Sequence, residues 1–493
     1  MPGLNASLYL GLTGIQAQQS ALNVVGHNIA NVNTPGYARQ RADLSSNQAL
    51  VEGQVYFGTG VSLNTVQGIR DRFLDLQIYR EVARQSGANE RYAGVDAVSA
   101  SLGDTSSTGI AAQVQAFFQG FQEVSARPED GALRASLIGK AQNMISGLQA
   151  RYRLLNEQRE SANFSVSSLV AEVNTLTDQI AQLNKRIATE GTRGEDNDAR
   201  DQRKTLTDKL ASLVGIHVFE GSQGEYQITL DSGSAVLVSG NTSYDLKASP
   251  GGPALDNYLK VESVMGSTLV DVTAGIQDGQ LGAKLDLRDN ILAGFQRQLD
   301  ELAAGVAGRV NLLHRAGFAA DGVTTGNDFF QSGVANGADG LPVSISAASF
   351  YKGMVNTLSV NSAVSGNPML VAAARIAGVR GDNDNAKDMA SLQTTGLTVD
   401  TTGDGVGDTG PFSSFIGSLV NDVGTKSQAY EVQSATQQNL VAALQAQRDR
   451  ISGVDLDEEA ANLMTLQRGY QASARFISVI NQLTDQLVNQ FGR

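Results

Sequence analysis

Apolar residues recur every seven positions near the amino terminus, which predicts one long amphipathic helix over residues 7–28. The members of this stripe, together with a residue that fills in on the same side, are Leu8, Leu12, Ile15, Leu22 and Ile29. Pro35 and Gly36 follow closely. Proline disfavours helix at the residue before it, and glycine tolerates the positive φ of a type II turn. We therefore expect the helix to stop and a tight turn to follow at Pro35 and Gly36.

A second heptad pattern closes the chain over residues 455–493. Its seam residues are Leu456, Leu463, Leu466, Tyr470, Ile477, Ile480 and Leu487, with Ser473 as a polar gap. Asp455 is predicted to cap this helix, and Glu458 to close a capping box with it. Because each terminal segment presents one apolar face, we expect residues 1–40 and 455–493 to pair as a coiled-coil-like inner domain that also forms the assembly interface. The alternative is that each helix simply packs on a globular core.

The interior of the chain changes character twice. Helical spacing dominates residues 70–214, 280–315 and 412–450, which we interpret as one helical bundle assembled from distant segments. Residues 216–275 alternate between apolar and polar, with turn residues between the runs, as short antiparallel strands do. Residues 316–411 are rich in Gly, Asp, Ser and Asn and are expected to form an irregular outer region of strands and loops. The predicted fold is therefore multidomain and mainly α, with inserted β-rich lobes outside the bundle.

Composition narrows the class of protein. The 493 residues suggest about two to four domains. The chain has no cysteine, which excludes disulfides, thiolate metal sites and thiol catalysis. Its net charge of −13 argues against nucleic-acid binding, which depends on neutralising phosphates. No apolar run approaches the ~20 residues of a membrane span, so no membrane insertion is expected, and no cleaved signal peptide is visible.

Candidate chemistry is sparse. The three histidines, His27, His217 and His314, share no metal-ligand spacing, and no phosphate loop or nucleophile elbow occurs, so we expect no enzyme, no catalytic residue, no metal and no cofactor.

Residues 400–411 partly match a calcium loop. Asp400, Asp404 and Asp408 take ligand positions, but Thr402 stands at position three and Pro411 at position twelve, where a bidentate Glu is needed. An acidic loop without calcium is favoured. A secreted calcium-binding structural protein and a cytoplasmic coiled-coil scaffold remain as alternative functions.

Two end segments carry a family resemblance. Residues 26–40, Gly-His-Asn-Ile-Ala-Asn-Val-Asn-Thr-Pro-Gly-Tyr-Ala-Arg-Gln, resemble the amino-terminal signature of flagellar rod, hook and hook-associated proteins. Residues 452–463 and 467–475 resemble the carboxy-terminal signature of the same family. Gly26-His27 and Gly36-Tyr37 resemble the hook–filament junction members, since hook and rod members usually have Gly-Asn and Gly-Phe there. Interior segments 201–206 and 278–289 also look typical of those members.

The resemblance implies a structural component of the bacterial flagellum. It implies an extracellular adaptor at the hook–filament junction that polymerises through its terminal helices in a helical lattice. The implied partners are the hook protein, a second junction protein and further copies of the chain. Export through the flagellar type III apparatus would need no cleaved signal, and a cytoplasmic chaperone is expected to cover the carboxy-terminal helix beforehand.

Overall fold

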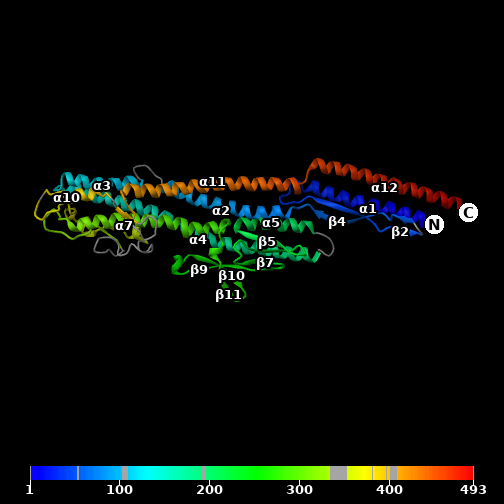
Figure 1. The fold of residues 1–493 in the computed structure, drawn as a ribbon, viewed down its shortest axis with the longest axis horizontal. Coiled ribbons are helices and arrows are strands. Elements are labelled where there is room, and N and C mark those ends of the chain that lie inside the picture. The colour runs from blue at the N-terminus through cyan, green and yellow to red at the C-terminus, as the bar shows by residue number, and fades with distance from the viewer. Residues whose placement is uncertain are drawn as a thin grey trace.

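The computed structural model describes residues 2–52, 55–102, 109–190, 196–332, 352–379, 381–395, 397–399 and 408–491. The molecule is elongated, and both chain ends lie at the same tip (Figure 1). The terminal helices α1 (Pro2–Ala30) and α12 (Leu456–Phe491) run side by side there. A helical bundle forms the body of the molecule, and two small sheets cover one side of it. This arrangement confirms the predicted mainly α fold with inserted β lobes.

The bundle is built from helices that are far apart in sequence. They are α2 (Arg72–Leu102), α3 (Ile110–Ala126), α4 (Gly131–Glu190), α5 (Asn197–Leu213), α6 (Gly279–Asp286), the π-helical turn η3 (Leu287–Ile291), α7 (Leu292–Ala316) and α11 (Phe412–Ser452). Within the helical segment expected over residues 70–214, α4 is a single helix of 60 residues, about 90 Å long at 1.5 Å per residue. No proline interrupts it, and its apolar face changes partner along its length, from the bundle core to the β lobe.

Residues 216–275 form the expected antiparallel strands. A four-stranded sheet and a three-stranded sheet contain, in order, β5 (Ile216–Glu220), β6 (Tyr226–Leu230), β7 (Val236–Ser239) and β8 (Thr242–Ser243), then β9 (Leu246–Pro250), β10 (Leu259–Met265) and β11 (Thr268–Asp271). Short 3-10 turns, η1 (Pro253–Leu255) and η2 (Thr273–Gly275), flank β10 and β11. The inward residues of β5 to β7 share one apolar core with α4 and α5. The β lobe is therefore packed onto the bundle and is not a detached domain.

The described part of residues 316–411 corrects one expectation. It is irregular, as predicted, but it completes the bundle core where a separate outer region was expected. Phe329 and Phe330 pack against Phe121 and Phe117, with ring centroids 5.6 and 5.5 Å apart. The short elements that follow also contribute to this core: β12 (Phe330–Gln331), α8 (Met354–Thr357), β13 (Ser359–Val360), α9 (Ser362–Gly366), η4 (Pro368–Leu370) and α10 (Asp384–Ser391). Beyond them, β14 (Leu397–Val399) pairs with β15 (Asp408–Gly410).

A β arm that the sequence pattern did not predict lies along α1. It consists of β1 (Gln40–Ser46) paired with β4 (Val61–Gly68), and of β2 (Leu50–Glu52) paired with β3 (Val55–Phe57). A Cβ added at Gly60 would lie 2.1 Å from Thr13 Oγ1, which shows how closely the arm approaches the helix. The inner domain thus has three parts: α1, α12 and the arm.

The bundle core contains a histidine that should make stability depend on pH. Burial lowers the pKa of His314 from 6.5 to about 4. Its Nδ1 lies 2.7 Å from the Asn327 carbonyl oxygen, and its Nε2 accepts a hydrogen bond from the Ala372 amide at 3.0 Å. Because the folded-state pKa is depressed, the contribution of the buried, neutral His314 to the free energy of unfolding is fully present above pH 6.5. It is lost as the pH falls from 6.5 to about 4, on the order of 3 kcal/mol.

The measurement is urea unfolding of the parent and of His314→Gln between pH 7 and 4. Burial raises the pKa of Asp300 to about 6, which stabilises the fold as the pH falls and opposes the histidine. This effect is common to both proteins and cancels in their difference. We expect the parent's advantage in free energy of unfolding to shrink over this window, and a constant difference would contradict the assignment.

Candidate functional site

The two signature segments, far apart in sequence, meet at one joint between the terminal helices and the bundle. Arg39 donates from Nε to Glu459 Oε1 at 2.6 Å, and from Nη1 and Nη2 to the two carboxylate oxygens of Glu458 at 2.9 and 2.7 Å. Its backbone amide also donates to the Ser452 carbonyl oxygen at 2.8 Å. Arg39 therefore ties the chain leaving α1 to the point where α11 turns into α12.

Asn28, at the end of α1, organises the buried side of this joint. Its amide pairs with the backbone of Gln40, donating to the carbonyl oxygen at 2.8 Å and accepting from the N–H at 2.9 Å. Asn28 Oδ1 also accepts from the Tyr37 hydroxyl at 2.8 Å, and its Nδ2 donates to Glu459 Oε2 at 3.2 Å. Burial is the main reason that the Tyr37 pKa is raised, with nearby carboxylates adding to it. A single amide side chain at the end of α1 therefore holds three segments together: α1 itself, the chain at Tyr37 and Gln40, and the start of α12.

Asp201, from the interior segment 201–206, anchors the joint to α5. Its Oδ2 accepts from the Ala38 amide at 3.1 Å, and its Oδ1 forms an ion pair with Arg70 Nη2 at 2.7 Å. Burial raises the Asp201 pKa, while Arg70 opposes that rise. Parts of three segments that carry the family resemblance, 26–40, 201–206 and 452–463, therefore converge in space, whereas segment 278–289 lies in α6 and η3, outside the joint.

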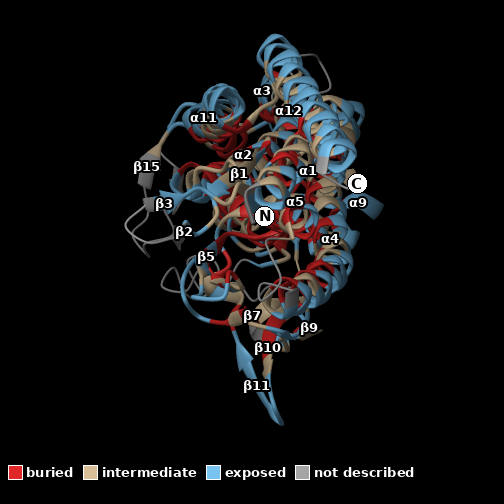
Figure 2. Ribbon diagram, turned by 90° about the vertical axis from the view of Figure 1, so that its right-hand side faces the viewer, coloured by how far each residue is buried: buried red, intermediate tan, exposed pale blue. Residues whose placement is uncertain are grey.

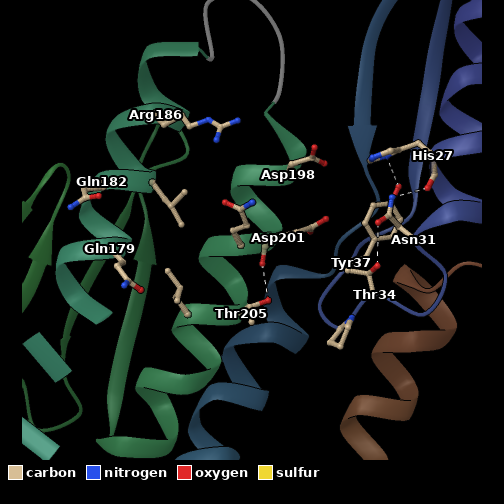
Figure 3. A pocket seen from close by; sticks show the side chains of 14 residues that line it. His27, Asn31, Thr34, Tyr37, Gln179, Gln182, Arg186, Asp198, Asp201 and Thr205 are labelled. Carbon is tan, nitrogen blue, oxygen red and sulfur yellow. Dashed lines mark hydrogen bonds between the residues drawn. The ribbon is translucent and has the colours of Figure 1, made fainter. Parts of the chain in front are cut away.

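The turn at Pro35 and Gly36 closes the joint against α5. Gly36 has a φ of +82°, and the Tyr37 amide donates to the Thr34 carbonyl oxygen at 3.2 Å, which is the type II geometry that a Pro-Gly pair favours. Figure 3 shows the residues around this turn facing Asp201 and Thr205 across a groove of about 810 Å³. A Cβ at Gly36 would lie 2.4 Å from Thr205 Oγ1, so the site demands glycine for two reasons.

Replacing Gly36 by valine should open the joint without unfolding the bundle. A β-branched residue at this positive φ costs about 1–3 kcal/mol, and the new side chain would also displace Thr205. We expect faster amide exchange at Ala38, whose N–H bonds Asp201, and a loss of assembly. The matched control is Gly26→Ala in α1, where an added Cβ meets nothing within 4 Å, so it should stabilise the helix by about 0.5–1 kcal/mol. Unchanged exchange at Ala38 in the valine variant would argue against a role for the turn.

The contact between α1 and α12 depends on small residues. A Cβ at Gly11 would lie 2.6 Å from Ile477 Cγ1, and one at Gly14 would lie 3.2 Å from Ser473 Oγ. Gly469 on α12 faces Gln18 in the same way. These glycines let the helices approach closely, and the heptad analysis, which followed large apolar residues, did not identify them.

The predicted interface residues fall into three groups. Ile480 is buried between the helices. Half-buried positions flank it, and they are Ile15, Leu22, Ile29, Leu463, Leu466, Ile477 and Leu487. Exposed positions are Leu8, Leu12, Leu456 and Tyr470. The subunit's own helix pair therefore covers only part of the predicted seam.

An uncovered apolar stripe lies beside this seam on α12. Phe476, Val479 and Leu483, spaced by three and four residues, are all exposed, and Val479 keeps 52% of its surface accessible. Leu8, Tyr9 and Leu12 are exposed on α1. We name these six residues the uncovered face. Figure 2 shows how much of α12 is exposed. In the sequence, the α12 part of the uncovered face is a second helical stripe at i, i+3 and i+7, which the heptad analysis did not identify.

The two terminal helices differ in charge. Residues 2–30 of α1 contain no Asp, Glu, Lys or Arg. The first turn of α12 does carry acidic residues, and Asp455 caps it by accepting from the Asp457 amide at 2.9 Å. Glu458 was predicted to close a capping box, but it pairs with Arg39. Further along, α12 also carries Arg468, Arg475 and Asp485, so only the α1 side of this helix pair is free of Asp, Glu, Lys and Arg.

The described residues contain no cluster of His, Asp or Glu side chains that could hold a metal ion. Within the same ranges, no helix has both the length and the apolarity of a membrane span. Most of the partial calcium loop at 400–411 lies outside the described residues.

Family comparisons match three parts of the chain. Residues 95–330 match the family described as the flagellar hook-associated protein FlgK helical domain. Residues 8–37 match the flagella basal body rod protein family, and residues 445–490 match the carboxy-terminal family of the flagellar basal body rod FlgEFG proteins. The carboxy-terminal match contains residues 452–463 and 467–475, and the amino-terminal match covers residues 26–37 of the first signature segment.

Whole-chain relatives agree with these matches. Flagellar hook-associated protein 1 of Escherichia coli K12 is 29% identical, over 97% of this chain and 98% of the relative. The protein of the same name from Bacillus subtilis is 27% identical, over 99% of both chains. The flagellar hook junction protein FlgK of Burkholderia pseudomallei shares the fold, with a TM-score of 0.65 at 19% identity, covering 76% of this chain and 100% of that one.

Proposed function

We propose that this chain, which belongs to the flagellar rod, hook and hook-associated family and is a full-length homologue of flagellar hook-associated protein 1, joins the flagellar hook to the filament. Its place among structural proteins of the flagellum follows from its relatives. The finer role is that of an adaptor, which polymerises through its terminal helices into a short zone between two different tubes. The alternatives of a cytoplasmic scaffold and of a calcium-binding protein have no relative among these matches.

The uncovered face is the observation that carries the proposal. Six large apolar side chains stand exposed on two helices at one tip of the molecule, and the described part of the subunit does not cover them. Exposed apolar surface of this kind marks a protein–protein interface. Because the helices lie parallel to the long axis at the tip, copies stacked side by side would bury these faces in a common inner layer (Figure 1). A contact of this heterologous type repeats as a helical lattice.

The proposed partners follow from the position of the zone. The hook protein would bind at one end, a second junction protein at the other, and further copies of this chain laterally. Before assembly the uncovered face of α12 would be exposed in the cytoplasm, so an export chaperone there would prevent aggregation. We place the assembled protein outside the cell, after export through the flagellar type III apparatus.

Electron microscopy of purified flagella tests the proposal. An antibody against this chain should label one narrow band where the hook ends and the filament begins. Cells lacking the chain should keep their hooks and release filament protein into the medium. Label spread along the whole filament, or flagella of normal length in the deletion strain, would refute the junction role.

A further inference from the structure

The three-stranded sheet ends in a projecting finger, residues 263–271, made of the ends of β10 and β11. The strands turn at Gly266 and Ser267, with Gly266 at a φ of +63°, and Met265 pairs with Thr268. All four residues of β11 are exposed. The finger points away from the body of its own molecule (Figures 1 and 2).

The finger carries apolar side chains on both faces. Met265 and Val270 lie on one face, because the pairs Met265–Thr268 and Ser263–Val270 alternate with Val264–Leu269, which places Leu269 on the other face. Met265, Leu269 and Val270 are all exposed. A two-stranded ribbon has little stability of its own in water, and exposed strands are usually guarded by charged residues. Residues 263–270 contain no charged residue, so this tip has the character of a surface that another molecule covers.

A groove with a partly apolar lining lies on the bundle. It has a volume of about 720 Å³ and is lined by Phe164 and Leu169 of α4, with the small side chains Ser161, Ser165 and Ser168 between them. Phe164 keeps 73% of its surface accessible, although it stands in the middle of the longest helix. The groove therefore offers an aromatic wall and shallow sites for side chains of the size of Met, Leu or Val.

Charge limits what the groove accepts. Its rim carries three carboxylates, Glu90, Glu157 and Glu160, against one cation, Lys284. The chain has a net charge of −13, so this acidic rim would repel most of the surface of a second copy. The rim would not repel the tip of the finger, because residues 263–270 carry no charge.

The finger and the groove also lie at the same position along the long axis of the molecule. Asn163, next to Phe164, accepts at Oδ1 a hydrogen bond of 2.8 Å from the amide of Leu259, the first residue of β10. In neighbouring copies that stand parallel, the finger of one is therefore level with the groove of the next.

We infer that the finger of each copy inserts into the α4 groove of a second copy beside it, forming an outer lateral contact in addition to the inner helical layer. This inference rests on the proposed function, because the proposed lattice supplies the parallel neighbour. The finger makes a lattice contact through the β lobe, at a site separate from the terminal helices.

Paired cysteines test the contact, since the natural chain contains no cysteine. Cells would carry Met265→Cys with Ser165→Cys as their only copy, and isolated flagella would be treated with a short bismaleimide. The control pair is Met265→Cys with Thr436→Cys, which is exposed on α11, a helix that contributes no residue to the groove. We expect about tenfold more cross-linked dimer in the test pair than in the control, because neighbours in a lattice meet at high effective concentration. Mass spectrometry of the band should show residue 265 joined to residue 165 of the same protein.

The outcomes separate the two proposals. The chain present in flagella with no excess of dimer, or with residue 265 joined to a different flagellar protein, would overturn the finger contact alone. Absence of the parent chain from flagella would overturn the junction role and the finger contact together. Leu269→Glu is a second check: it should melt like the parent, because the side chain is exposed, yet reduce the cross-link severalfold by repulsion from the rim.

Discussion

Cells whose only copy of this chain carries Val479→Asp should make hooks without filaments. Val479 lies at the centre of the α12 part of the uncovered face, with 52% of its surface accessible, so the free subunit should unfold within about 0.5 kcal/mol of the parent. In the assembled layer the same position loses about 1.5–3 kcal/mol of apolar burial, and a carboxylate must also give up its hydration. Because every copy in the lattice repeats this penalty, incorporation should fail. Electron microscopy of the cells and thermal unfolding of the purified variant measure the two halves of the expectation.

Gln471→Asp is the matched control for this variant. Gln471 is exposed on the same helix but lies outside both the seam and the uncovered face, so the same charge there should permit filaments. Filaments of normal length in Val479→Asp cells would show that α12 assembles through another face. A variant that unfolds in solution would show that the valine belongs to the subunit's own core.

Replacing Arg39 by methionine should release α12 from the joint. Glu459 is only 1% exposed, and its main counter-charge is the Arg39 guanidinium 2.6 Å away. A buried carboxylate that loses its partner is destabilised by about 3–5 kcal/mol, and methionine keeps the length of the stem. The bundle has its own core, so the loss should be local. Hydrogen exchange should therefore increase across α12 and the end of α1, and stay near the parent's rate in α4.

Glu458→Gln provides the comparison for this second variant. Glu458 also binds Arg39, but it is 56% exposed, and exposed ion pairs contribute about 0–1 kcal/mol. Its α12 should exchange almost as slowly as the parent's. Equal exchange in the two variants would mean that burial of Glu459 does not hold the joint.

The sequence predicted the elements of the inner domain better than their contacts. Heptad spacing located α1 and α12 correctly because helical periodicity is a local property. It did not show that Gly11 and Gly14 form the closest contact, since small residues add little to an apolar pattern but decide how near two backbones can come. For the same reason it could not separate residues that face the partner helix from those left uncovered.

Resemblance identified the segments of the joint but not how they join. That Asn28, Arg39, Asp201 and Glu459 meet depends on the path of more than four hundred intervening residues, about which local pattern says nothing. The region after residue 316 was misplaced because Gly, Asp and Ser dominate it, and the few apolar residues that enter the core, such as Phe329, are too widely spaced to form a period. The β arm was missed because its two longer strands, β1 and β4, contain mostly polar residues and so give little apolar pattern.

The hydrogen bond between Asn28 and Glu459 spans 431 residues. A contact between such distant parts of one chain is slow to form, because almost the whole polymer must be ordered before its ends can find each other. The bundle and the β lobe are built mostly from neighbouring segments and can fold first, while the amino-terminal helix waits for a partner that is made and delivered last. A chain cut short anywhere before α12 can thus have an intact body and still lack the inner layer. Under the proposed assembly, pairing α1 with a helix that follows more than four hundred residues later makes synthesis of α12 a condition for joining the structure.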